Sequence, residues 1–138
     1  MLSPTLGVLL ADDDPLVRAG LRTILSAADD LRVVGEAGDG AAAIAGVAAY
    51  RPDVVLMDVR MPGLGGLEAA RRLRAQGLET PIIALTANAF DDDRRACLDA
   101  GMDDFLVKPL SLDALRGALA RWTGAGWTRQ RRRAKVAS

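Results

Sequence analysis

The sequence predicts one α/β domain, in which five strand–helix units surround a parallel sheet. Five short apolar segments alternate with segments whose apolar residues recur at helical spacing. The apolar segments are continuous rather than alternating, which is typical of strands that helices bury on both faces. The chain has 138 residues, enough for one domain with a sizeable core.

The first unit begins with the apolar segment 7–11, which we interpret as a buried strand. In the next segment Asp14 suits a helix N-cap, and Pro15 suits the first helical position, where no backbone N–H is needed. Apolar residues at i, i+4, i+7 and i+11 predict the buried face of this helix, formed by Val17, Leu21, Ile24 and Ala28.

The other four units repeat the order of apolar strand and helix. Their expected bounds are strand 31–37 with a helix ending at 50, strand 52–58 with helix 67–76, strand 80–86 with helix 91–100, and strand 104–108 with a last helix from 112. In the second helix we expect Ile44 and Val47 to face inward. Ser111 is expected to cap the last helix, whose apolar face is Leu112, Leu115, Leu119 and Trp122.

The stretch GEAGDG at 35–40 follows a strand and opens a helix, so a nucleotide-binding loop has to be considered. Its glycine spacing differs from the dinucleotide fingerprint, and no P-loop lysine follows. We therefore interpret it as a tight strand-to-helix turn.

The composition excludes several kinds of site. The chain has no histidine, which removes the usual general base, the usual metal ligand and any histidine phosphoacceptor. Its single cysteine, Cys97, cannot form an internal disulfide. We expect Cys97 to be buried as a small apolar residue, and the protein to lie in a reducing, cytoplasmic setting. No apolar run reaches the length of a membrane span, and no signal peptide is recognised.

Charge is distributed unevenly although the net charge is zero. We expect a globular body at 1–122, with an excess of acid, and a basic, flexible C-terminal tail at 123–138, too short for a DNA-binding domain. Binding of nucleic acid or an acidic membrane surface stays an alternative for the tail. Positive charge comes almost entirely from arginine, so Lys108 is the only lysine of the body.

Polar side chains end four of the predicted strands. Asp12 and Asp13 follow the first, Asp58 ends the third, Thr86 the fourth and Lys108 the fifth. Ligands of parallel α/β sheets bind at the carboxyl ends of the strands, so these groups are expected on one rim. Clustered carboxylates are tolerated around a divalent cation such as Mg²⁺, and lysine and hydroxyl groups bind phosphate oxygens. The set indicates a site that handles a phosphoryl group.

Two other acidic features have simpler interpretations. We expect Asp14 to cap a helix rather than to bind metal. The acidic run FDDD at 90–93 stands where a helix begins, and acids favour that end of the helix dipole. We interpret it as helix capping and not as a second metal site.

Four motifs occur in order: LLADDD, VVLMDVRMPGLGG, IIALTA and DFLVKP. With them, residues 6–122 resemble the receiver domain of two-component response regulators. The resemblance implies a doubly wound, flavodoxin-like (βα)5 sheet with strand order 2-1-3-4-5. It also implies that Asp58 accepts a phosphoryl group from a partner histidine kinase or histidine phosphotransfer protein, in a reaction that needs Mg²⁺ or Mn²⁺.

The resemblance assigns roles to the other site residues. The implied metal ligands are Asp12, Asp13, Asp58 and the backbone carbonyl of Arg60. The implied phosphoryl-binding and switch residues are Thr86, Ala87, Lys108 and Phe105, the aromatic whose rotation accompanies activation. The bond before Pro109 is implied to be cis, and X–Pro bonds are where cis is affordable.

The resemblance also implies a signalling domain that helps to catalyse its own phosphorylation and dephosphorylation and is not an enzyme. Its output would be altered binding of an unknown partner, or of a second copy, through the face of helix 91–100, strand 104–108 and the last helix. The first half of the sequence is similar to receivers that precede LuxR-type DNA-binding domains, and the second half is similar to receivers of hybrid histidine kinases. Of the possible arrangements, we expect a free-standing receiver. Two alternatives stay open: a Mg²⁺-dependent phosphohydrolase with Asp58 as nucleophile, and a pseudo-receiver that only binds proteins.

Overall fold

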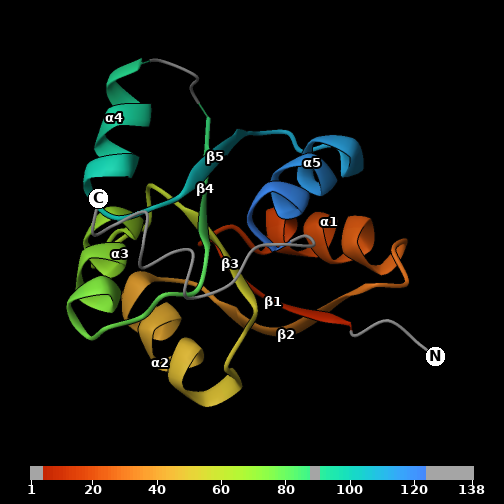
Figure 1. Ribbon diagram of the computed structural model, residues 1–138, viewed down its shortest axis with the longest axis horizontal. Helices are drawn as coiled ribbons and strands as arrows, with labels where there is room; N and C mark the ends of the chain where they lie inside the picture. Colours follow the sequence, from red (N-terminus) through yellow and green to blue (C-terminus); the bar gives the residue numbers. More distant parts are fainter. Residues whose placement is uncertain (1–4, 88–90, 124–138) are drawn as a thin grey trace.

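The computed structural model describes residues 5–87 and 91–123 and confirms the predicted fold. Five parallel strands form one sheet in the order β2-β1-β3-β4-β5, with helices on both faces (Figure 1). The strands are β1 (Leu6–Ala11), β2 (Leu31–Ala37), β3 (Val54–Asp58), β4 (Ile82–Thr86) and β5 (Asp104–Val107). The helices are α1 (Pro15–Ser26), α2 (Gly40–Tyr50), α3 (Gly66–Ala75), α4 (Asp91–Asp99) and α5 (Leu112–Thr123).

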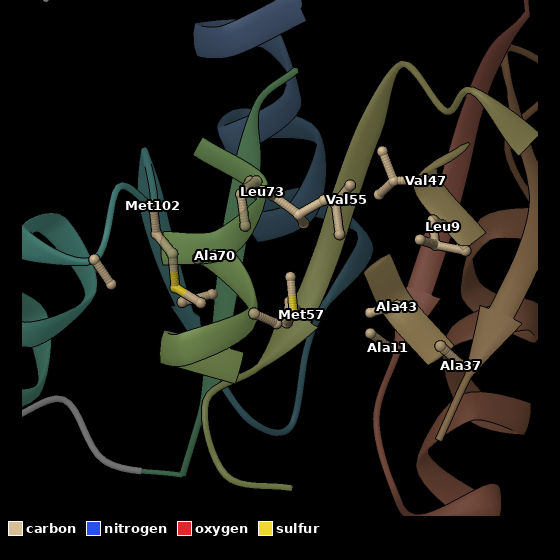
Figure 2. Close-up of a cluster of buried hydrophobic side chains, with 14 of the residues drawn as sticks. Leu9, Ala11, Ala37, Ala43, Val47, Val55, Met57, Ala70, Leu73 and Met102 are labelled. Carbon is tan, nitrogen blue, oxygen red and sulfur yellow. The ribbon is translucent and has the colours of Figure 1, made fainter. Parts of the chain in front are cut away.

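Successive residues of each central strand belong to opposite faces of the sheet. Leu10 packs in a cluster with Leu21 of α1 and Leu115 of α5. Its neighbour Leu9 packs in a second cluster under α2, α3 and α4, part of which Figure 2 shows, including Leu73. A strand buried on both sides has no use for polar residues, which explains why the strand segments are continuously apolar.

The buried residues agree with the helical faces expected from the sequence, with one correction. Ala28 was expected on the face of the first helix, but α1 ends at Ser26, and Ala28 lies in the following turn. The chain tightens there, because the Ala27 N–H donates to the carbonyl of Ile24 and the Ala28 N–H to that of Leu25. Ala28 is buried all the same, against the cluster that contains Leu25.

Three strands are shorter than expected. The third begins at Val54 instead of at 52, the fourth begins at Ile82 instead of at 80, and the fifth ends at Val107 instead of at 108. Two of the missing segments contain Pro52 and Pro81, which have no N–H to donate to a ladder. The helices agree with expectation to within a residue or two at their ends.

In the stretch 35–40, positions 35–37 still belong to β2, and the short turn that joins this strand to α2 packs against another loop. The Gly40 N–H donates to the carbonyl of Leu64 at 2.8 Å, and a Cβ on Gly40 would lie 2.4 Å from the same oxygen. Asp39 caps α2 by accepting from the Ala42 N–H at 2.7 Å. The N–H groups of Gly40 and Ala42 are therefore bonded within the protein and are not directed at a phosphate. This confirms the strand-to-helix turn and argues against a nucleotide-binding loop.

Arg74, a partly buried residue, joins the C-terminal end of α3 to the segments that precede β4 and β5. Arg74 of α3 donates to the carbonyls of Leu78, Thr80 and Gly101 at 2.8–2.9 Å and to the Asp103 carboxylate at 2.9 Å. Burial lowers the pKa of Arg74 to about 10, so the guanidinium stays charged at neutral pH. The contacts hold the C-terminal end of α3 against the segments that begin β4 and β5.

Cys97 is buried, as expected for a small apolar residue, and forms no disulfide. Within residues 5–87 and 91–123, no helix combines the length and apolarity that crossing a bilayer requires. The expected tail lies outside the described residues except for position 123, and the side chains of the FDDD run also lie outside them.

Candidate functional site

The strand ends bring the predicted site residues together at one rim of the sheet. Asp12 follows β1, Asp58 ends β3, Thr86 ends β4 and Lys108 follows β5. The Lys108 Nζ atom donates to Asp12 Oδ2 at 2.6 Å and to Asp58 Oδ2 at 3.1 Å. One ammonium therefore bridges two carboxylates that lie 46 positions apart in the chain.

The position of Asp58 depends on the start of α3. The other oxygen of its carboxylate, Oδ1, accepts from the Arg60 N–H at 3.2 Å. Gly66, the first residue of α3, donates its N–H to the carbonyl of Val59 at 3.1 Å. A Cβ on Gly66 would lie 2.0 Å from the backbone oxygen of Asp58, so glycine permits the helix to begin directly against the strand end.

Each polar atom of Asp12, in the backbone and in the side chain, forms a hydrogen bond. Its N–H donates to the carbonyl of Ala37 at 2.9 Å, and its own carbonyl accepts from Arg18. Carboxylate oxygen Oδ1 accepts from the Asp14 N–H at 2.9 Å, while Oδ2 accepts from Lys108. These bonds explain how a carboxylate of which no part is exposed can be accommodated in the core.

The third aspartate of the run has the capping role that the sequence predicts. Asp14 is the N-cap of α1, and its Oδ1 accepts from the Leu16 N–H at 2.9 Å. Asp13, between the two, is exposed to solvent. The three consecutive carboxylates thus have three different surroundings: a buried hydrogen-bond network, open solvent and a helix terminus.

The carboxylates of Asp12, Asp13 and Asp58 satisfy the requirements of a small divalent cation. One oxygen of each lies within 4.8 Å of the others. All are hard oxygen donors, and Asp13 opens the cluster to water, which suits an ion that keeps part of its hydration shell. The donor set fits Mg²⁺ and also Mn²⁺.

The pKa values of Asp58 and Lys108 are both raised, which favours the neutral form of the carboxyl and the charged form of the amine. Burial raises the pKa of the Asp58 carboxyl above its ordinary value, and the nearby Asp12 charge adds to this. The Arg60 N–H and Lys108 act against the increase. Burial alone would lower the pKa of Lys108, but its hydrogen bonds to Asp12 and Asp58 outweigh burial and raise it, so the ammonium is retained.

The remaining predicted residues surround this centre. Thr86 is buried, and its carbonyl accepts from the Lys108 N–H at 2.8 Å. Ala87, next in the chain, is exposed. Phe105 is partly buried beneath α4, with the Arg94 guanidinium 4.5 Å above its ring centre. The peptide bond between Lys108 and Pro109 is cis.

Two contact residues of the site were not among those predicted. Arg94, above Phe105, lies on a helix whose orientation only the fold defines. Arg18, bonded to Asp12, does have a local sequence signal. Side chains on a helix lean toward its N-terminus, and Arg18 is the residue one turn after the N-cap Asp14.

A family model described as the response regulator receiver domain matches residues 8–120. Among curated proteins, the response regulator MprA of Mycolicibacterium vanbaalenii is 45% identical over 126 residues, which cover 86% of this chain and 54% of that protein. The chain spans about half the length of the curated relatives that it matches.

Solved structures agree with the sequence relatives. The receiver domain of the putative response regulator NarL from Mycobacterium tuberculosis superposes with a TM-score of 0.81 at 34% identity, over 86% of this chain and 96% of that one. The receiver domain of sensor histidine kinase PA1611 from Pseudomonas aeruginosa PAO1 has a TM-score of 0.78 at 40% identity, over 88% of this chain and 99% of that one. That structure has a magnesium ion coordinated in its active-site cleft.

Proposed function

The chain belongs to the response regulator receiver domain family, and on this premise we propose that it is a phosphorylation switch whose phosphoacceptor is Asp58. One observation carries the proposal. The Asp58 carboxylate meets Lys108 at the point where oxygens of Asp12, Asp13 and Asp58 converge within 4.8 Å. Anionic ligands for a metal ion and a cation for phosphoryl oxygens therefore flank one nucleophile.

The residues that would hold Mg²⁺ are Asp12, Asp13, Asp58 and the backbone carbonyl of Arg60. When bound, the ion neutralises charge on the transferring phosphoryl oxygens, which is the main requirement of phosphoryl transfer. The protein keeps two of the three carboxylates buried, so they are already positioned before the ion arrives.

Asp58 is the nucleophile of the proposed reaction. Its carboxylate oxygen forms the new P–O bond as the P–N bond of a donor phosphohistidine breaks, and the leaving imidazole takes up a proton. The donor histidine belongs to a partner kinase or phosphotransfer protein, since this chain has none. Because burial raises the pKa of Asp58, the donors Arg60 N–H and Lys108 matter in keeping the attacking oxygen ionised.

Lys108 and Thr86 are the proposed partners of the bound phosphoryl group. Lys108 already contacts Asp58 and would exchange one carboxylate contact for a phosphoryl oxygen. Thr86 ends the strand next to Asp58, so its hydroxyl can donate to another oxygen, with the Ala87 N–H beside it.

The output surface proposed is the face of α4, β5 and α5. Phe105 lies on it under Arg94. The Asp104 carboxylate binds α5 to β5, because it accepts from Arg121 at 2.6 Å and from Trp122 Nε1 at 3.0 Å. A shift of Thr86 or Phe105 would therefore be transmitted to a connected surface, where a partner protein or a second copy binds.

We also propose that the receiver domain occupies residues 1–122, that 123–138 form a basic tail, and that the protein acts in the cytoplasm. Its own chemistry would be limited to assisting phosphorylation and dephosphorylation of Asp58, without a separate substrate.

The function is tested by incubating the purified chain with acetyl phosphate and Mg²⁺ and measuring its intact mass. We expect one phosphoryl group per chain, dependence on Mg²⁺, and no mass gain in the Asp58→Asn variant. A phosphohydrolase would instead release inorganic phosphate over many turnovers, and a pseudo-receiver would gain no mass. Mass gain in Asp58→Asn would show that the acceptor assignment is wrong.

A further inference from the structure

A side chain of α1 reaches back beneath the loop that carries the acidic pair. Arg18 donates from Nη1 to the backbone carbonyl of Asp12 and from Nε to the Glu36 carboxylate at 3.1 Å. Its side chain is 21% exposed. A guanidinium held by two different acceptors has a fixed orientation, because its donors form a rigid planar fork.

The position of Glu36 on this side of the sheet depends on an irregularity in β2. Val8 pairs with Val33, but the next residue, Leu9, pairs with Gly35, so Val34 is an extra residue in β2. Glu36 consequently pairs with Leu10, whereas a register without the extra residue would pair it with Ala11.

That one-residue shift decides which helix Glu36 meets. Leu10 faces α1 and α5, whereas Ala11 belongs to the cluster under α2 and α3. Paired residues of neighbouring strands point to the same face, and a slip of one residue reverses the face. With the irregularity, Glu36 faces α1 and binds both Arg18 and Arg22.

The carbonyl that Arg18 binds belongs to the peptide between the two proposed metal ligands. That peptide connects Asp12, whose side chain is fixed by Lys108 and the Asp14 N–H, to Asp13, whose side chain is exposed. Fixing its orientation defines where the Asp13 side chain begins relative to the buried carboxylates.

We propose that Arg18, held in place by Glu36, is a positioning residue of the metal site: it orients the Asp12–Asp13 peptide so that both carboxylates face one ion. The inference rests on the proposed function for the identity of the ion. Groups that orient metal ligands from behind commonly change metal affinity by 10- to 100-fold when they are removed, by the general behaviour of such supporting groups.

The sign of the effect separates positioning from simple electrostatics. Arg18 carries a positive charge, so its removal should strengthen binding of a cation if only Coulomb attraction acted. Positioning predicts the opposite, a weaker site.

Arg22 offers a matched control on the same helix. Its Nη1 donates to the other oxygen of Glu36 at 2.9 Å. Among the contacts of the described residues, only Arg18 of the two also donates to Asp12. Arg22→Met thus removes an equal charge and a bond to the same carboxylate, while the bond to the acidic loop stays.

The experiment measures the Mg²⁺ dissociation constant of the full chain without phosphoryl donor, by NMR titration of the Asp13 and Asp14 amide signals. We expect Arg18→Met to weaken Mg²⁺ binding about tenfold and to shift both amides in the metal-free protein. Arg22→Met should bind Mg²⁺ as the wild type does or slightly more tightly. Arg18→Lys, which can still donate to the carbonyl, should restore part of the loss.

Glu36→Gln provides a second variant in case Arg18→Met does not fold. It should loosen Arg18 without touching the acidic loop and give a smaller loss in the same direction. Mg²⁺ affinity of Arg18→Met equal to or tighter than that of Arg22→Met would overturn the positioning role. Failure of the wild type itself to bind Mg²⁺ would instead overturn the proposed function.

Discussion

Replacing Gly66 with alanine tests how tightly α3 is joined to β3, the strand that ends at the proposed phosphoacceptor Asp58. The added Cβ would lie 2.0 Å from the Asp58 carbonyl oxygen, whereas Cβ contacts under 3.0 Å are essentially never seen. The two atoms must therefore separate by about 1 Å. Neither side moves easily, because Asp58 is buried in the sheet and the Gly66 N–H is bonded to Val59.

The expected cost is that of overpacking a rigid backbone contact, about 1–3 kcal/mol. The higher helix propensity of alanine offsets up to about 1 kcal/mol of this cost. We expect a net loss of about 1–2 kcal/mol in the free energy of unfolding, or roughly 3–6 °C in melting temperature for a domain of this size. The displaced Asp58 should also be phosphorylated more slowly.

Urea unfolding followed by circular dichroism measures the loss, and Gly20→Ala is the matched control. Gly20 lies inside α1, and a Cβ there would meet no heavy atom within 4 Å. The control should therefore stabilise the protein by about 0.5–1 kcal/mol. Gly66→Ala protein as stable as the wild type, with a normal phosphorylation rate, would refute the argument.

Four other predictions test separate parts of the structure. Asp13→Ala should weaken Mg²⁺ binding and phosphorylation together without loss of stability, because the residue is exposed; an unchanged dissociation constant in a titration would count against its role as ligand. Lys108→Arg keeps the charge but replaces a compact ammonium with a wide planar guanidinium, so the variant should gain little phosphoryl mass, or gain it without the shift of the β4 and β5 NMR signals. Wild-type behaviour in both measurements would show that charge alone suffices. Arg74→Met should cost about 3–5 kcal/mol in urea unfolding, since it removes the cation from the buried Asp103 carboxylate, which then keeps the Ile82 N–H but not this positive charge. Arg72→Met, in an exposed ion pair, should cost less than about 0.5 kcal/mol, and equal losses would contradict the argument for the buried pair. Asp58→Asn should stabilise the metal-free protein at neutral pH, because burial raises the Asp58 pKa and so disfavours the ionised form in the folded state. This gain in stability should vanish as the pH falls and Asp58 takes up its proton, and a gain that grew on acidification would show that the sign is wrong.

The strand ends of the site were predictable because two local rules agree there. Apolar segments end at Asp12 and Asp58, and the carboxyl ends of parallel strands share a rim, so the meeting of these residues with Lys108 needed no knowledge of side-chain contacts. The capping role of Asp14 was likewise local, because Pro15 follows it.

Two sets of supporting contacts were not predictable, those of Glu36 and those of Arg74, because they depend on register or on distant backbone. The extra residue in β2 leaves no mark in the apolar pattern of 31–37, yet it decides whether Glu36 meets Arg18. In the sequence Arg74 does not differ from the other arginines of its helix. Only the tertiary fold places three carbonyl groups and the Asp103 carboxylate around it. The end of α1 does not follow from the apolar pattern, because Ala28 is buried without being helical.

The position of the phosphoryl group is measured most directly by trapping it. Borohydride reduces an aspartyl phosphate to homoserine with loss of phosphate, and peptide mass spectrometry then locates the converted residue. After incubation with acetyl phosphate and Mg²⁺, we expect homoserine at position 58 and unconverted Asp12 and Asp13. Conversion at Asp12 or Asp13, or no conversion in protein that has gained the phosphoryl mass, would contradict the assignment of Asp58 as the acceptor.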